Sequence, residues 1–411
     1  MIYGLIGKRL GHSFSREIHG RLSSDPYELR ELAPSELPGF LRERDFRGIN
    51  VTIPYKQAVM PHLDVLDESA VRSGAVNTIV NRDGKLYGYN TDFDGFIMLA
   101  RHASVDFRDA GVVILGAGGA AKAVAAAARS MGAASVRNAV RTPRAEGQLP
   151  ITDIAAFKDC DILVNATPVG MYPDWQGRLV DLDSFPRLRG VLDCIYNPLW
   201  TSLVLDARER GIAADGGLYM LVGQAIKARE LFAGETYSGS DVEMEFRHLM
   251  RSKRNIVLCG MPSCGKSTVG SELARYTGRR FVDTDEIVAL QAGMEIPDIF
   301  SREGEAAFRL RETAAIESIA PEQGLVVATG GGAVLSETNC RLLRHNGILI
   351  LLNRDPELLV PTADRPLSRS REELMALYSR RMPLYAKAAD FIISNNGPVE
   401  HTVYKLIEYA V

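Results

Sequence analysis

A glycine-rich run in the second half of the chain carries the residue types that hold a nucleoside triphosphate. Residues 260–268 have the sequence GMPSCGKST, which fits the pattern GxxxxGK[ST] and directly follows the apolar stretch Asn255–Cys259. In such a loop the backbone amides cradle the phosphates, the lysine reaches the β- and γ-phosphates, and the hydroxyl binds Mg²⁺. The run therefore predicts a site for ATP and Mg²⁺. The residues expected to contact the nucleotide are Gly260, Ser263, Gly265, Lys266, Ser267 and Thr268, with Ser267 also on the metal.

Charged residues downstream of this loop suit a small anionic alcohol as the acceptor of a phosphoryl group. Asp283 and Asp285 offer one carboxylate for magnesium and one for the acceptor hydroxyl. Arg309 and Arg381 can clamp a carboxylate, because a guanidinium group binds it through two parallel hydrogen bonds. Taken alone, each arginine is equally explained by a solvated helix face. A later run of three glycines lets backbone amides approach the same ligand. The acceptor-site candidates are Asp285, Arg309, Gly331, Gly332 and Arg381, and the metal candidates are Ser267 and Asp283.

A second glycine-rich turn lies in the first half of the chain, between an apolar strand and an alanine-rich helix. Residues 112–121 have the sequence VVILGAGGAA. The spacing GxGxxA lets the backbone approach a pyrophosphate, which then sits at the N-terminus of the helix. Alone this pattern is weak, because a glycine turn before any helix packed on a sheet can produce it. The residues expected at the dinucleotide are Gly116, Gly118, Gly119, Ala120 and Ala121.

The end of the next strand decides between the two nicotinamide dinucleotides. A site for NAD normally has an acidic residue about 20 residues further on, which binds the ribose hydroxyl. The stretch 136–144 contains no acidic residue and offers Arg141, Thr142 and Arg144 instead. Guanidinium groups suit the 2′-phosphate of NADP. The pattern therefore predicts NADP(H), although arginines that merely cover a solvated strand end would look the same.

Polar groups in the first hundred residues suit the reduction of a ketone. Hydride delivery needs a proton donor beside the developing alkoxide and polar groups that hold the remaining substrate. Lys56 and Asp92 can form the proton-donating pair. Singly, each candidate is more readily explained as a turn or capping residue. The hydroxyls and amides that can hold the substrate are Ser13, Ser15, Asn50, Thr52 and Asn77.

Short β-branched runs alternate with helical patterns along the chain, which predicts an α/β protein with mainly parallel sheets. Helical patterns include Ala120–Met131 and Ser267–Thr277. The segment Gly239–Asn255 changes from glycine and serine to mixed charge before a new strand, so we place the domain junction there. The strand candidates are Tyr3–Ile6, Gly48–Ile53, Val112–Leu115, Ser135–Ala139, Asp161–Asn165, Val191–Cys194, Asn255–Cys259, Leu325–Ala328 and Gly347–Leu352.

The bulk composition narrows the class of protein. A chain of 411 residues, 46% hydrophobic and 24% charged, predicts a globular protein of two or three domains. A net charge of -3 gives no reason to expect nucleic acid or an acidic membrane as a partner. We expect no secretory signal and no membrane span, and five reduced cysteines that build no metal site. These features together predict a globular cytoplasmic protein.

Blocks across the first 248 residues resemble the shikimate dehydrogenase family, in that family's order. The resemblance implies reduction of 3-dehydroshikimate to shikimate with NADPH. It implies Lys56 and Asp92 as the catalytic pair, and it adds Gln224 to the substrate ligands Ser13, Ser15, Asn50 or Thr52, and Asn77. The blocks lie at residues 7–15, 50–56, 75–78, 90–95, 165–171, 193–198 and 216–224.

The same resemblance implies domain boundaries and two departures from the family pattern. Residues 1–97 and 218–248 would form an α/β substrate domain, and 98–217 a Rossmann NADP domain between them. Val140 precedes Arg141-Thr142 where the family usually has asparagine, which predicts one hydrogen bond fewer to the cofactor and weaker selectivity for NADP. Arg16 stands where the family commonly has proline.

Blocks after residue 253 are similar to the shikimate kinase family. The similarity implies a P-loop kinase domain with a parallel sheet at 255–411, after a linker at 249–254. It implies transfer of the γ-phosphoryl group of ATP to the 3-hydroxyl of shikimate, with Asp285 deprotonating that hydroxyl. Arg365, on a lid that is short at Glu357–Arg365, would stabilise the transferring charge. The blocks lie at residues 281–285, 299–309, 330–332, 365–367 and 381–385.

The two halves together predict a bifunctional enzyme, because the product of the first reaction is the substrate of the second. We expect this enzyme to be a monomer or a homodimer. One alternative is a regulatory protein that senses the same metabolites without turnover, but the retained Lys56, Asp92 and Lys266 argue against it. Another is a dehydrogenase that prefers quinate and NAD, which the basic pair Arg141 and Arg144 disfavours.

Overall fold

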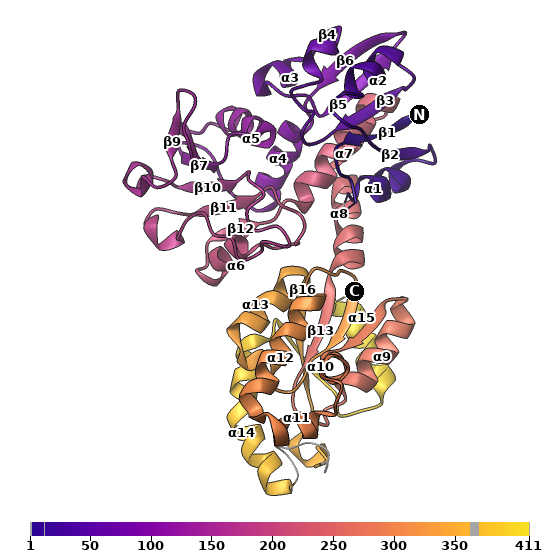
Figure 1. Cartoon of the computed structure of the whole chain (residues 1–411), viewed down its shortest axis with the longest axis vertical. Helices are drawn as coiled ribbons and strands as arrows, with labels where there is room; N and C mark the ends of the chain where they lie inside the picture. Colours follow the sequence, from indigo (N-terminus) through magenta and orange to yellow (C-terminus); the bar gives the residue numbers. More distant parts are fainter. Residues whose placement is uncertain (1, 12, 362–369, 411) are drawn as a thin grey trace. The chain divides into compact units, whose positions relative to one another are not determined.

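Three sheets organise the described residues, two in a first unit, Met1–Arg247, and one in a second unit, His248–Val411. The structure is a computed structural model that describes residues 2–11, 13–361 and 370–410. Helices lie on the sheets of both units (Figure 1), and most strand pairs are parallel, which confirms the predicted α/β class.

The first sheet carries most of the candidate substrate ligands. Its part of the chain contains β1 Tyr3–Gly7, α1 Ser15–Leu22, β2 Tyr27–Glu31, α2 Leu37–Glu43, β3 Gly48–Val51, β4 Val65–Leu66, α3 Glu68–Ser73, β5 Thr78–Arg82 and β6 Lys85–Tyr89. The strand order is β2-β1-β3-β5-β6-β4, with β1, β2 and β3 parallel. The β5–β6 pair is an antiparallel hairpin, which the sequence analysis did not predict. A core that includes Ile6, Ile49 and Ile79 packs with residues of α2 and α3 and fixes this sheet.

The second sheet is parallel throughout and has the strand order β12-β11-β10-β7-β8-β9. Its elements are α4 Asp92–His102, β7 Gly111–Leu115, α5 Gly119–Ser130, β8 Ser135–Val140, β9 Gln148–Pro150, β10 Ile162–Asn165, β11 Gly190–Asp193, α6 Ser202–Glu209, β12 Ala213–Asp215 and α7 Leu218–Ala233. Val112 and Ile114 pack with α4 and α5, whereas Val113 and Leu115 pack on the other face, where α6 lies. Burial of both faces explains the unbroken apolar run of β7. The strand order reverses between β7 and β10, the place where dinucleotides bind in this architecture.

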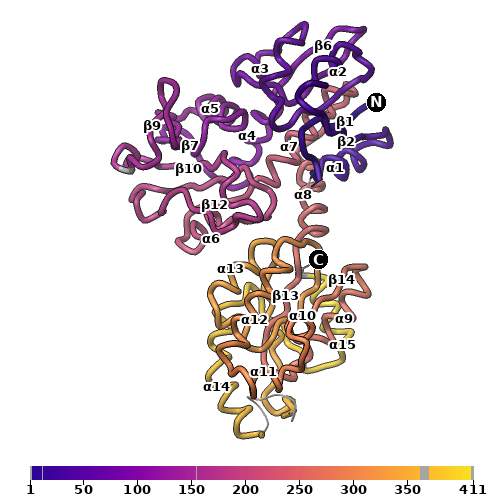
Figure 2. Tube along the Cα trace, in the orientation of Figure 1, coloured from indigo at the N-terminus to yellow at the C-terminus, as the bar shows by residue number. Residues whose placement is uncertain are grey.

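Two helices, α4 and α7, cross closely in the first unit (Figure 2). A Cβ atom on Gly95 would lie 2.6 Å from the carbonyl oxygen of Met220, and one on Gly223 would lie 2.7 Å from the sulfur of Met98. Larger residues at these two positions would therefore force the helices apart. The crossing sets α7, which carries Gln224, against the first turns of α4, which begins at Asp92.

The second unit is built on a five-stranded parallel sheet of order β14-β15-β13-β16-β17. The elements from the junction onward are α8 Gly239–Lys253, β13 Asn255–Cys259, α9 Lys266–Thr277, β14 Arg280–Asp283, α10 Thr284–Ala292, α11 Ile296–Arg302, α12 Gly304–Ile319, β15 Leu325–Ala328, α13 Glu337–Asn346, β16 Gly347–Asn353, α14 Arg371–Ala388, β17 Phe391–Ser394 and α15 Val399–Ala410. Helices α9 and α15 pack together, and α12 packs with α13 (Figure 1). The turn after β13 lies at the point where the strand order reverses, between β13 and β16.

The segment expected to be a linker is helical. Residues 249–253 lie inside α8, and the chain enters β13 one residue after this helix ends. The Arg279 guanidinium donates to the carbonyl oxygens of Arg251 and Arg254, so it caps the C-terminal end of α8. The mixed charge of this segment thus belongs to a helix surface rather than to an extended connection.

All five cysteines are free, and Cys194 is the one that is only partly buried. A search of the described helices found none with the length and apolar character that a membrane crossing needs.

Candidate active sites

A lysine and an aspartate form a close ion pair in the first unit. Lys56 lies in the loop after β3, and Asp92 is the first residue of α4. The distance from Lys56 Nζ to Asp92 Oδ2 is 2.5 Å, and the two side chains are 18% and 8% exposed. The structure thus brings together two residues 36 positions apart that the sequence analysis paired. Partial burial keeps the ammonium group available to a ligand while limiting its hydration.

The side-chain amides of Asn77 and Asn90 hold Asp92 in place. Asn77 Nδ2 donates to Asp92 Oδ1 at 2.9 Å, and the backbone N–H of Thr91 donates to Asn77 Oδ1 at 2.8 Å. Asn90 Oδ1 accepts from the Asp92 N–H at 3.1 Å. Asn77 is fully buried, so its amide orientation is set by these partners rather than by water. The predicted ligand Asn77 therefore lies in contact with the ion pair.

The two candidate serines lie together at the start of α1. Ser13 Oγ donates to Ser15 Oγ at 3.1 Å, and the N–H of Ser15 donates back to Ser13 Oγ at 3.2 Å. The ring of Phe14 packs against Tyr196, which follows β11, with 5.2 Å between the ring centroids. This contact brings the serine loop next to the carboxyl edge of the second sheet.

The alternative ligands Asn50 and Thr52 differ in their surroundings. Asn50 is buried and bonds within the protein: its Oδ1 accepts from Tyr27, and its Nδ2 donates to Thr78. Thr52 is half-buried in the loop that leads to Lys56. The burial of Asn50 favours Thr52 as the residue of the two that can reach a ligand. Sequence reasoning gave no signal for Tyr27, which lies 23 residues from Asn50.

Gln224 reaches the site through the helix crossing. Its Nε2 donates to the carbonyl oxygen of Leu221 in its own helix at 2.9 Å, and its side chain is half-buried. A Cβ atom on Gly95 would lie 3.0 Å from the Gln224 backbone nitrogen, so Gln224 packs beside Gly95 of α4. Gly95 in turn lies about one helical turn after Asp92.

The predicted dinucleotide loop lies against Lys56. Gly116 has φ +106, which a side chain would strain, and its Cβ would meet Thr167 at 2.9 Å. The Asn138 side chain fixes the turn by donating to the Gly116 carbonyl oxygen at 2.7 Å. A Cβ atom on Gly119 would lie 3.4 Å from Lys56 Cδ. Backbone free of side chains at the N-terminus of α5, next to Lys56, fits the pyrophosphate of a dinucleotide.

The predicted 2′-phosphate ligands lie at the end of β8. Arg141, Thr142 and Arg144 are all exposed. The backbone N–H of Arg144 donates to Gln148 Oε1 at 2.8 Å, which holds the turn into β9. Arg141 and Arg144 thus lie on the surface, after the strand whose end contacts the adenosine ribose of a dinucleotide in this architecture.

A buried aspartate, which sequence reasoning did not single out, organises the carboxyl ends of β10 and β11. Asp193 is fully buried and accepts from Asn165 Nδ2 at 3.1 Å, from Thr201 Oγ1 at 2.7 Å and from the N–H of Ile195 at 2.9 Å. Burial raises the pKa of Asp193 to about 6, against the lowering effect of these donors. Asp193 therefore fixes the loops that flank the dinucleotide site.

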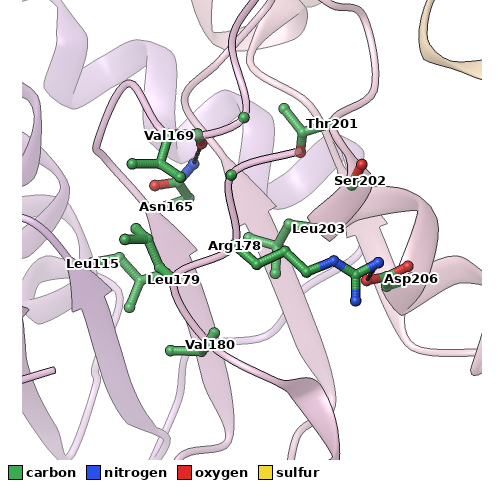
Figure 3. A pocket seen from close by; sticks show the side chains of 12 residues that line it. Leu115, Asn165, Val169, Arg178, Leu179, Val180, Thr201, Ser202, Leu203 and Asp206 are labelled. Carbon is green, nitrogen blue, oxygen red and sulfur yellow. Dashed lines mark hydrogen bonds and ion pairs between the residues drawn. The ribbon is translucent and has the colours of Figure 1, made fainter. Parts of the chain in front are cut away.

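A small pocket, partly open to solvent, lies beside this network (Figure 3). Leu115, Leu179 and Leu203 contribute apolar surface, and Arg178 pairs with Asp206 at 3.3 Å. Figure 3 shows the Arg178 side chain extended toward Asp206, away from Asn165. The lining includes neither member of the Lys56–Asp92 pair, so this pocket is separate from the reacting groups.

The glycine-rich loop of the second unit has the geometry of a phosphate site. It follows β13 and opens α9, and Lys266 Nζ donates to the carbonyl oxygens of Gly260 and Met261 at 3.0 Å each. These bonds hold the Lys266 ammonium group against the loop, from where it can reach the phosphate oxygens of a nucleotide. Ser263 is held at φ +65, and its hydroxyl donates to the Val360 carbonyl oxygen at 2.6 Å. The residues present fit the β- and γ-phosphates of ATP.

Asp283, the last residue of β14, and Asp285, in the first turn of α10, have different partners. Ser267 Oγ donates to Asp283 Oδ2 at 2.7 Å, so the two predicted Mg²⁺ ligands are in direct contact. Such a hydroxyl–carboxylate pair at a phosphate loop fits Mg²⁺. Asp283 also accepts from the N–H of Asp285 at 3.0 Å and caps α10. Asp285 points to the glycine run, since a Cβ atom on Gly330 would collide with its carboxylate.

The predicted carboxylate clamp surrounds the same glycine run. Arg381 is buried, and its Nη1 donates to the Gly331 carbonyl oxygen at 2.9 Å. The Arg309 guanidinium lies where a side chain on Gly332 would be. Tyr385, which lies in one of the family blocks but received no role from the sequence, donates to the same Gly331 carbonyl oxygen. Arg309, Arg381 and Asp285 thus converge on residues 330–332, as predicted, whereas Arg365 lies outside the described residues.

A buried glutamate also belongs to this cluster and was missed. Glu312 is 1% exposed, and its Oε2 accepts from Arg309 Nη1 at 2.8 Å. Burial raises the pKa of Glu312, while the positive charge of Arg309 lowers it. The spacing of three residues from Arg309 on one helix was the available signal. Glu312 holds Arg309 toward the glycine run.

Lowering the pH is expected to destabilise the first unit through His19. Burial and the positive charge of Arg229 lower the pKa of His19 from 6.5 to about 3. The unfolded chain therefore binds the proton first, and the stability present above pH 6.5 is lost as the pH falls toward 3. The expected loss from this group between pH 7 and pH 5 is about 2 kcal/mol.

Urea unfolding followed by tryptophan fluorescence measures this loss, because Trp175 and Trp200 both lie in the first unit. His19→Phe should flatten the pH dependence, since phenylalanine can replace the stacked ring beside Tyr27 without titrating. An unchanged slope in this variant would assign the acid sensitivity to another group.

Comparisons with known proteins match the two units separately. The description "Shikimate dehydrogenase substrate binding domain" matches residues 5–79, and "Shikimate kinase" matches residues 262–410. A shikimate dehydrogenase (NADP(+)) of Clostridium perfringens is 34% identical over 272 residues, which cover 60% of this chain and 98% of that protein.

Solved structures give the same result for the first unit. Shikimate 5-dehydrogenase of Thermus thermophilus, in complex with NADP(H) and shikimate, is 33% identical with a TM-score of 0.54, covering 60% of this chain and 99% of that one. Quinate dehydrogenase of Corynebacterium glutamicum, in complex with NAD, is 30% identical with a TM-score of 0.53, covering 61% and 99%. With its sheets, its dinucleotide loop and its P-loop, the chain belongs to the shikimate dehydrogenase family and continues into a shikimate kinase domain, so it joins two enzymes of the shikimate pathway.

Proposed function

We propose that this chain reduces 3-dehydroshikimate to shikimate with NADPH and then phosphorylates the 3-hydroxyl of shikimate with ATP. The observation that carries the first reaction is the Lys56–Asp92 pair beside Gly119 of the dinucleotide loop. The second reaction is supported by Asp285, Arg309 and Arg381, which meet around one glycine run in the unit that holds the P-loop.

The loop at residues 116–121 would hold NADPH, which would supply the hydride for the carbonyl carbon of the substrate. The Lys56 ammonium group donates a proton to the carbonyl oxygen as it becomes a hydroxyl, and Asp92 holds the ammonium in place. Asn77 keeps the Asp92 carboxylate turned toward the lysine. We assign Ser13 and Ser15 to the substrate carboxylate, and Thr52 and Gln224 to its hydroxyls.

In the kinase site Asp285 takes the proton of the shikimate hydroxyl that attacks the γ-phosphorus, and ADP leaves. Lys266 stabilises the charge on the transferring phosphoryl group, as a preorganised cation does in phosphoryl transfer. Arg309 and Arg381 bind the carboxylate of shikimate, together with the amides of Gly331 and Gly332. Ser267 and Asp283 are the ligands we assign to Mg²⁺, which supplies positive charge at the phosphates.

Selectivity for NADP is expected to depend on Arg141. Arg141→Ala should raise the KM for NADP⁺ on the order of tenfold and leave the KM for NAD⁺ nearly unchanged, because NAD⁺ has no 2′-phosphate to lose a contact. Initial rates of shikimate oxidation with each dinucleotide measure both values. Arg101→Ala, an exposed arginine on α4, serves as the matched control. A parallel rise of both KM values would place Arg141 outside the 2′-phosphate site.

The alternative first reaction is the oxidation of quinate with NAD. It needs a test, since a quinate dehydrogenase in complex with NAD is among the similar structures. The arginines after β8 and the absence of an acidic residue in the stretch 136–144 favour NADP. Shikimate and quinate, each with NADP⁺ and NAD⁺, therefore form the test of the first reaction, read at the absorbance of the reduced nicotinamide. Preference for shikimate with NADP⁺ supports the proposal, and preference for quinate with NAD⁺ overturns it.

The remaining assignments stay predictions. We propose residues 1–97 and 218–248 as the substrate domain, 98–217 as the NADP domain and 255–411 as the kinase domain. We also propose a cytoplasmic location and a monomer or homodimer, for which size-exclusion chromatography with light scattering gives the mass.

A further inference from the structure

A buried asparagine of the second unit donates a hydrogen bond to the backbone of the P-loop. Asn395 directly follows β17, 131 residues after Cys264 of the loop, and is 2% exposed. Its Nδ2 donates to the Cys264 carbonyl oxygen at 2.7 Å. Its backbone N–H donates to the carbonyl oxygen of Asn353, the last residue of β16, also at 2.7 Å. Asn395 therefore connects the carboxyl ends of β16 and β17 to the loop that follows β13.

The orientation of the Asn395 amide is determined by its partners. A carbonyl oxygen only accepts, so the amide must turn its Nδ2 toward Cys264. Its Oδ1 then faces Thr402 of α15, whose hydroxyl donates to it at 2.7 Å. Thr402 is also 2% exposed, and α15 packs with α9, the helix that the P-loop opens. Turning the amide over would set two acceptors against each other at Cys264, so a single arrangement satisfies both neighbours.

The next residue of the loop leaves room for this contact. A Cβ atom on Gly265 would lie 2.7 Å from Asn395 Nδ2, and Gly265 has φ +95, which a side chain would strain. The peptide bond between Cys264 and Gly265 is planar and trans, so its N–H points away from the Cys264 carbonyl oxygen. Because Asn395 binds that oxygen, it also fixes the direction of the Gly265 N–H.

We propose that Asn395 is a positioning residue of the kinase site, which keeps the Gly265 N–H directed at the phosphates of ATP. In a loop of this sequence the backbone N–H groups are the donors that cradle the phosphates. Their alignment before binding avoids the cost of ordering them when the nucleotide arrives. Asn395 acts through the Cys264–Gly265 peptide and does not touch the nucleotide. The proposal rests on the proposed function only for the role of the P-loop in binding ATP.

Asn395→Leu in the full chain removes both side-chain hydrogen bonds and keeps a side chain of similar size. The dissociation constant for ATP with Mg²⁺, measured by isothermal titration without shikimate, is expected to rise about fivefold, the equivalent of one hydrogen bond. The KM for ATP should rise with it. The KM of the kinase reaction for shikimate and the reduction of NADP⁺ should stay within about twofold of the parent. An unchanged dissociation constant for ATP would overturn the proposal.

Asn346→Leu is the matched control in the same unit. Asn346 is 1% exposed, its Nδ2 donates to the Ala320 carbonyl oxygen at 3.0 Å, and its Oδ1 accepts from Gln323 at 3.3 Å. The control thus loses the same kinds of bond outside the P-loop, and its affinity for ATP should stay within about twofold of the parent. Equal weakening of ATP binding in both variants, or a KM for shikimate that rises with the KM for ATP, would give Asn395 a merely structural role.

Two substitutions at Thr402 test the connection and cover the case in which Asn395→Leu does not fold. Thr402→Val removes the hydroxyl that orients the amide and should weaken ATP binding about threefold, whereas Thr402→Ser keeps the hydroxyl and should restore the parent value. Combined with Asn395→Leu, Thr402→Val should add nothing, because Thr402 acts only through the amide. Equal affinities of the valine and serine variants would contradict the proposal. A parent protein that binds ATP without phosphorylating shikimate would instead refute the proposed function.

Discussion

Lys56→Ala is expected to lower kcat for shikimate oxidation on the order of 10³-fold, because positioned proton transfer contributes about 10² to 10⁴ to such reactions. The Lys56 ammonium, the proposed proton donor, lies 2.5 Å from Asp92 Oδ2, and no other lysine of the described residues makes an ion pair with that aspartate. ATP-dependent phosphorylation of shikimate by the same variant should be unchanged, since Lys56 lies in the first unit. Both rates are measured on one preparation.

The control for this variant is Lys85→Ala, an exposed lysine at the tip of the β5–β6 hairpin. It should keep full dehydrogenase activity. Loss of both activities in a folded Lys56→Ala protein would contradict two separate sites, and normal dehydrogenase activity would remove Lys56 from the reaction.

Lys266→Ala is expected to have the converse effect. Removing one preorganised cation from a site of developing charge costs on the order of 10² to 10³ in kcat, so ADP release in the presence of shikimate should fall by that factor. The reduction of NADP⁺ by shikimate should be retained. ADP formation followed by a coupled pyruvate kinase and lactate dehydrogenase assay measures the loss.

Lys405→Ala, an exposed lysine on α15, is the matched control in the kinase unit. Isothermal titration with ATP adds an independent readout, since Lys266→Ala should also weaken nucleotide binding. Undiminished ADP release would show that the loop at Gly260–Thr268 does not serve this reaction.

Segments whose own sequence pattern is distinctive could be predicted from that pattern alone. Asn255–Cys259 and Leu325–Ala328 match the predicted strands residue for residue, because central parallel strands are uninterrupted apolar runs. The P-loop and the dinucleotide turn were found from spacing alone, since glycine is required where backbone approaches phosphate. Residue type made Lys56 and Asp92 candidates for a proton-donating pair, the family resemblance implied that they form one, and the structure shows them as an ion pair.

Elements at sheet edges were missed because half or more of their residues face solvent. β2 has the sequence YELRE and β17 exposes Phe391 and Ile392, so neither forms a buried run. The β5–β6 hairpin did carry a signal, the Asp83–Gly84 turn with φ +51 and +82, which the sequence analysis did not use. The α8 helix was interpreted as a junction because its composition is strongly polar.

The missed site residues have roles that arise only in the folded chain. Tyr27 meets Asn50 because β1 lies between β2 and β3 in the sheet, which no local spacing predicts. Asp193 was quoted within a family block, but its role appears only when Asn165 and Thr201 donate to it. Glu312 becomes part of the kinase site because Gly330 leaves room for two carboxylates, its own and that of Asp285.

The measurement that tests the central claim most directly starts from 3-dehydroshikimate, NADPH and ATP with the full-length protein and no added enzyme. NADPH oxidation and ADP formation are followed together. We predict that both proceed and that ADP formation approaches one molecule per NADPH oxidised, with no ADP formed when NADPH is left out. NADPH oxidation without ADP formation, or ADP formation that does not depend on NADPH, would contradict a chain that performs the two reactions in sequence.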